Sequence, residues 1–124
     1  MTAARSAPVH MAVAFLAMGG WAMVANAGHP MPKPLYAGLV QGCLSAVITL
    51  GLKLMVEAMV RRLAGVAALL VPPVAAALCS IAILGTIHHL AGTPEIARTL
   101  ALPATVTTLY AAALAFTLRR RGHG

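Results

Sequence analysis

The stretch LYAGLVQGCLSAVITLGLKLMVEAMV, residues 35–60, decides the fold of this chain. It is almost continuously apolar, and as an α-helix it exceeds the roughly 20 residues that a bilayer core of about 30 Å requires. Three further apolar runs cover residues 9–27, 72–90 and 100–118. The runs are continuous rather than alternating and rich in Ala, Leu and Met, which favours helices over strands. The sequence therefore predicts an all-α, polytopic membrane protein, a bundle of four transmembrane helices.

Composition supports this fold class and excludes others. The chain has 124 residues, of which 60% are hydrophobic and 9% are charged. Soluble domains carry roughly 25% charged residues, so this chain cannot build a polar shell around a soluble core. The net charge of +7 is divided into short clusters between apolar runs, which argues against nucleic acid as a partner. We expect one membrane domain over residues 1–124.

Two helix boundaries are open in the sequence. The apolar segment 63–71 precedes Pro72 and Pro73, so the third helix begins either near residue 64, with a kink, or at residue 72. Thr93, Pro94 and Glu95 have the order of an N-cap, a first-turn proline and a first-turn acid. The fourth helix is therefore expected to begin near residue 94, or else with the apolar run at residue 100.

Positive charge predicts the orientation. With both termini in the cytoplasm (N-in/C-in), the inner side holds seven of the nine Lys and Arg residues and the outer side holds only Lys33 and Arg98. The inner residues are Arg5, Lys53, Arg61, Arg62, Arg119, Arg120 and Arg121. Together with the high Gly and Ala content, this pattern indicates the inner membrane of a bacterium.

A secretory signal peptide is the competing interpretation of the N-terminus. Arg5, the apolar stretch 9–24 and the sequence Ala25-Asn26-Ala27 have the three parts of such a signal, including a cleavage pattern. Cleavage would leave three helices.

The helix predicted over residues 35–60 has two different sides. Polar and small residues recur on one side at a spacing of three or four residues, which predicts close packing against protein. They are Gly38, Gln41, Gly42, Ser45 and Thr49. The opposite side carries Leu39, Leu44, Val47 and Leu54, which suit lipid. The fourth helix offers a mate with matching small residues at Ala104, Thr108, Ala111 and Ala115.

Lys53 and Glu57 lie one helical turn apart and are expected to form an intramembrane ion pair. Such residues invite a hypothesis of proton- or ion-coupled transport. The favoured interpretation is structural, because both lie near the cytoplasmic end, where Lys53 can extend to the interface.

Three histidines are expected at the outer surface, at positions 29, 88 and 89. Their spacing matches no metal or haem motif, so no metal and no cofactor is predicted. A sharper hypothesis is an outer-face contact with lipid or another anion, made by Lys33, His88, His89 and Arg98 around the start of the fourth helix.

An enzyme is not expected, because the chain has only two acidic residues, both glutamates, and no nucleophile motif. The favoured hypothesis is an accessory or assembly subunit of a larger inner-membrane complex. It would dock other membrane-protein subunits through the polar and small face of the second helix. The alternative is a small transporter or lipid flippase, which would work as a homodimer. Membrane lipid is a partner in both.

Overall fold

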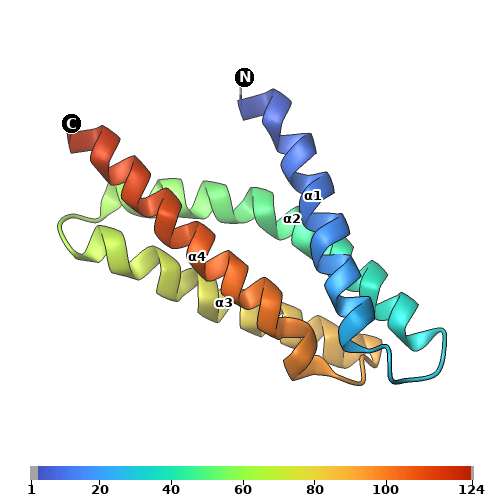
Figure 1. The fold of residues 1–124 in the computed structure, drawn as a ribbon. Helices are drawn as coiled ribbons and strands as arrows, with labels where there is room; N and C mark the ends of the chain where they lie inside the picture. The colour runs from blue at the N-terminus through green and yellow to red at the C-terminus, as the bar shows by residue number, and fades with distance from the viewer. Residues whose placement is uncertain (1–2, 124) are drawn as a thin grey trace.

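The computed structural model describes residues 3–123, and side chains over residues 8–121, as four helices (Figure 1). These are α1 (Ala3–Ala25), α2 (Lys33–Arg62), α3 (Ala67–Ala91) and α4 (Ile96–His123), and no strand occurs within this range. Each helix is long and apolar enough to cross a membrane. The prediction of an all-helical chain with four candidate spans is confirmed.

The helices alternate in direction, so the bundle has two distinct ends (Figure 1). Both chain termini and the α2–α3 connection, residues 63–66, lie at one end, which we call the terminal end. The α1–α2 and α3–α4 connections, residues 26–32 and 92–95, lie at the other, which we call the loop end. At the terminal end α1 and α4 diverge, whereas α3 and α4 run side by side.

α3 begins at Ala67, between the two starts expected at residues 64 and 72, and Pro72 and Pro73 lie inside it. The helix ends at Gly92, whose φ of 77° is readily adopted only by glycine. The Gly92 N–H bonds to the His89 carbonyl and the Thr93 N–H bonds to the His88 carbonyl. This Schellman-type ending folds Thr93 back beside the last turn of α3.

The expectation that Thr93 caps α4 is wrong. The Thr93 side chain turns toward α3 and hydrogen-bonds His88, and α4 begins at Ile96. Asn26, from the distant α1–α2 connection, takes over the capping role: its Oδ1 accepts the Glu95 N–H at 2.9 Å. A free backbone donor at a helix start can be satisfied by any nearby oxygen, and the fold brings Asn26 there.

α1 and α2 approach closely at three glycines. A Cβ atom on Gly19 would lie 2.8 Å from the Gly38 carbonyl oxygen, and one on Gly42 would lie 3.0 Å from the Phe15 carbonyl oxygen. The nearest neighbours of Gly38 and Gly42 therefore come from α1, rather than from the expected mate on α4. Small residues allow this approach between membrane helices.

The small residues of α4 that were expected to pack against Gly38 and Gly42 lie nearer the terminal end. Ala111 and Ala115 are fully buried and form an apolar cluster with Leu52, Val56 and Ala76. Ala104 and Thr108 are half-buried.

The distribution of polarity is the reverse of that in a soluble protein. Asn26, Gln41, His88 and Thr99 are fully buried, whereas large apolar side chains such as Leu90 are exposed over the outside. No buried side-chain nitrogen or oxygen in the described part of the chain lacks a hydrogen-bond partner. A satisfied polar interior within an apolar exterior suits a bundle surrounded by lipid.

Candidate functional site

A buried polar cluster near the loop end joins α2 to α3. His88 Nε2 lies 2.8 Å from Gln41 Oε1, and His88 Nδ1 lies 2.7 Å from Thr93 Oγ1. Because the Gln41 oxygen can only accept, Nε2 carries the proton, and Nδ1 of the neutral ring accepts from the Thr93 hydroxyl. Gln41 Nε2 in turn donates to Ser45 Oγ at 2.7 Å. This chain of bonds places Gln41 and Ser45 of the expected α2 face inside the protein.

A second cluster joins the two connections of the loop end. Asn26 Nδ2 donates to Thr99 Oγ1 at 2.8 Å, and Thr99 donates to the Glu95 carbonyl at 2.6 Å. His29 Nε2 bonds to Glu95 Oε2 at 2.9 Å. This hydrogen bond holds the pKa of the Glu95 carboxyl below its ordinary value, and the charges of His29 and Arg98 lower the pKa further.

The residues expected to contact lipid or an anion are divided by the structure. Lys33, His89 and Arg98 are exposed at the loop end, but His88 is fully buried. The inclusion of His88 in a surface contact is therefore wrong, because its two nitrogens are used by Gln41 and Thr93. An anion contact by the other three residues stays a prediction.

Lys53 and Glu57 do not form the expected ion pair in this structure, although both are half-buried on α2. Among the described residues, the one contact between oppositely chargeable side chains joins His29 and Glu95. The same residues contain no group of three or more His, Cys, Asp or Glu side chains placed to hold a metal.

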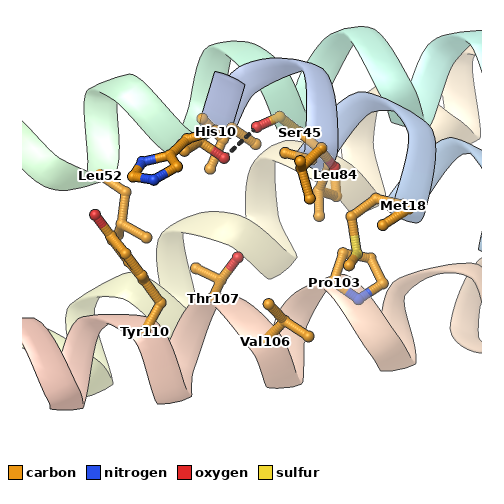
Figure 2. Close-up of a pocket in the computed structure, with 14 residues that line it drawn as sticks. His10, Met18, Ser45, Leu52, Leu84, Pro103, Val106, Thr107 and Tyr110 are labelled. Carbon is orange, nitrogen blue, oxygen red and sulfur yellow. Dashed lines mark hydrogen bonds between the residues drawn. The ribbon is translucent and has the colours of Figure 1, made fainter. Parts of the chain in front are cut away.

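A pocket of about 320 Å³ opens between α1, α2 and α4, with Leu84 of α3 also lining it (Figure 2). The lining is mostly apolar. It consists of His10, Val13, Ala14, Ala17, Met18, Ser45, Ile48, Thr49, Leu52, Leu84, Pro103, Val106, Thr107 and Tyr110.

The pocket has a more polar end and an apolar end. His10 and Tyr110 lie toward the terminal end, whereas Met18 and Pro103 lie toward the loop end (Figure 2). Thr107 lies between these ends with its hydroxyl directed into the space.

The α2 wall of the pocket is continuous with the buried polar cluster. Thr49 Oγ1 donates to the Ser45 carbonyl at 2.7 Å, and Ser45 Oγ accepts from Gln41. Two residues of the expected α2 face, Ser45 and Thr49, are thus pocket residues.

Sequence reasoning missed the other polar members of the pocket. His10, Thr107 and Tyr110 lie on helices that are adjacent only in the folded chain, and none belongs to a short motif. The available signal was the small side chains Ala14 and Ala17 on α1, which leave space in the bundle.

The chain matches no protein-family model, no curated protein and no solved structure. Its class follows from fold and site alone. Four candidate spans around a satisfied polar interior suggest a multi-pass membrane protein.

Proposed function

We propose that this protein is a small carrier that binds one lipid-like molecule within the bilayer. The observation that supports it is the 320 Å³ pocket between α1, α2 and α4. Ligand pockets in proteins have volumes from about 300 Å³ upward, are mostly apolar and carry a few polar groups. An engineered apolar cavity of about 150 Å³ already holds benzene, so this space suits a longer apolar chain.

The position of the pocket supports a ligand that comes from the membrane. Its lining lies on the apolar parts of the helices, and the lining residues Val13 and Val106 are 59% and 42% exposed. In a bilayer the exposed parts of these two side chains would face acyl chains, so the pocket would open toward lipid. A lipid-like molecule could then enter sideways without crossing water.

The orientation belongs to the same proposal. Arg61, Arg62 and the arginines 119–121 lie at or near the terminal end of the bundle. By the positive-inside bias, this end faces the cytoplasm of a bacterial inner membrane, which gives the N-in/C-in topology. The homodimer expected of a transporter this small stays a prediction.

An accessory role in a larger complex is less well supported by the geometry. Gly38, Gln41, Gly42 and Ser45 are buried within the chain. α1 covers the two glycines and Gln41 bonds to His88 of α3, so a partner could reach this face only by displacing these helices. Docking of other subunits therefore stays a prediction and would have to use a different surface.

The proposal is tested by filling the pocket. Val106→Trp places a large ring in the lining, whereas Val47→Trp places the same ring on the outer face of α2, where Val47 is 68% exposed. Native mass spectrometry of the detergent-solubilised protein, titrated with a total lipid extract, measures bound lipid. We expect the wild type and Val47→Trp to retain one molecule and Val106→Trp to lose it. Equal retention by both variants would refute the proposal.

A further inference from the structure

We propose that the pocket selects an uncharged amphiphile. Its hydroxyl or carbonyl head would lie among His10, Thr107 and Tyr110, and its chain would extend toward Met18 and Pro103. This inference rests on the proposed function and specifies its ligand. The predicted outer-face contact of Lys33, His89 and Arg98 with lipid or another anion is a separate site, because none of these residues lines the pocket.

The charge of the lining residues limits which head groups the pocket can accept. Among the residues whose side chains the structure describes, no Lys, Arg or Glu belongs to the lining. A phosphate or carboxylate head would have to leave water without a Lys or Arg in the described lining, and an ammonium head without a Glu there. Such a transfer is far more costly than burying a hydroxyl or carbonyl that finds a hydrogen bond. The lining therefore disfavours charged heads.

The hydroxyl of Thr107 differs from those of the other threonines on α4. Four of them donate to the carbonyl oxygen four residues earlier, which is the usual partner of a threonine in a membrane helix. They are Thr99, Thr105, Thr108 and Thr117. Thr107 makes no such bond within the described residues, and its hydroxyl points into the pocket (Figure 2).

Tyr110 adds a second hydroxyl to the same space. It is half-buried in the pocket wall, and its Oη has no hydrogen-bond partner in the part of the chain that the structure describes. Inside a bilayer, where water is scarce, two hydroxyls without protein partners favour a ligand that can hydrogen-bond with them.

The separation of polar and apolar lining orients the ligand. His10 and Tyr110 mark the terminal end, and Met18, Pro103 and Val106 form apolar walls farther along (Figure 2). A molecule with one polar end and one long chain matches this arrangement. A purely apolar molecule would leave the hydroxyls unpaired.

A series of probes with the same chain tests the head group. Hexadecanol, palmitate and hexadecyltrimethylammonium share a chain and differ in charge when palmitate is assayed well above its carboxyl pKa, which an apolar interface raises. Competition against pyrene-labelled lipid on the wild-type protein should rank hexadecanol tightest, by at least about tenfold over each charged probe. Equal or tighter binding of palmitate or the ammonium compound would overturn the inference.

Matched hydroxyl deletions test the position of the head. Tyr110→Phe and Thr107→Val should each weaken hexadecanol binding by roughly 2- to 10-fold and leave hexadecane binding unchanged. Tyr36→Phe and Thr105→Val remove the same groups outside the pocket and should change neither. Unchanged hexadecanol binding in both pocket variants would also overturn the inference.

The failure of this inference differs from that of the proposed function. If charged and neutral probes bind equally and Val106→Trp still blocks all of them, only the head-group assignment falls. If no probe binds to the wild type, or Val106→Trp blocks none, the carrier proposal falls with it.

Discussion

Gly19 is the position at which one added methyl group should affect the bundle most clearly. In Gly19→Ala the new Cβ would lie 2.8 Å from the Gly38 carbonyl oxygen and 3.4 Å from the Gly42 Cα. Both neighbours are backbone, so a side-chain rotation cannot relieve the contact, and α1 must move away from α2. Overpacking of this kind costs about 1–3 kcal/mol. At the adjacent position, a Cβ on Gly20 would meet no atom within 4 Å.

Comparison of the two variants isolates this cost. Replacing glycine by alanine in a helix contributes up to about 1 kcal/mol of stability at either position, and this gain cancels in the difference. Gly19→Ala should therefore be less stable than Gly20→Ala by about 1–3 kcal/mol. Reversible unfolding in mixed detergent micelles, followed by circular dichroism, measures both free energies. If the two variants are equally stable, the close α1–α2 contact described here is wrong.

Three further perturbations test the loop end of the bundle. Gln41→Leu should lower the free energy of unfolding by about 0.5–2 kcal/mol, because it leaves the buried His88 Nε2–H without an acceptor. The same substitution in a His88→Leu background should cost less, and equal costs would disprove the coupling. The depressed pKa of Glu95 means that the folded state binds this proton less readily than the unfolded state. The stability that ionised Glu95 contributes to the folded state is therefore fully present above the ordinary carboxyl pKa. It is lost as the pH falls through the lowered pKa of the folded state. Melting temperatures measured across this acidic range should decline in the wild type and decline less in Glu95→Gln, and parallel curves would contradict the role of the His29 contact. Gly92→Ala forces a side chain into the left-handed region at φ 77° and should lower the stability by about 1–2 kcal/mol, and an unchanged melting temperature would argue against this helix ending.

The number of helices could be predicted from the sequence because hydrocarbon thickness imposes a minimum length on every span. The four apolar runs meet that length, and the four helices follow them. The small and polar side of α2 was likewise visible as a pattern, and the structure buries Gln41 and Ser45 while it exposes Val47 and Leu54.

The partner of that side could not be predicted, because a stripe of small residues indicates close packing without saying what packs there. Ala111 on α4 offered a matching stripe, but Gly19 on α1 permits a closer backbone approach to Gly38. Likewise, the hydrogen bond between buried His88 and Thr93 depends on the turn at Gly92, which returns Thr93 to the end of α3. The local sequence pattern does not show which side chain will meet His88 after the chain turns back.

The pocket was beyond sequence reasoning for a related reason. His10 and Tyr110 are separated by most of the chain, and their helices diverge at the terminal end (Figure 1). The pocket arises from the angle between the helices rather than from a motif.

Photo-labelling tests the central claim most directly, namely that one lipid-like chain occupies the pocket. The protein would be irradiated in bilayers with a hexadecanol analogue that carries a diazirine along its chain, and labelled residues would be mapped by mass spectrometry. We expect labelling to concentrate on Met18 and Val106 and to fall sharply when unlabelled hexadecanol competes. Labelling spread evenly over outward-facing residues such as Val47 and Leu78, and unaffected by competitor, would contradict the account.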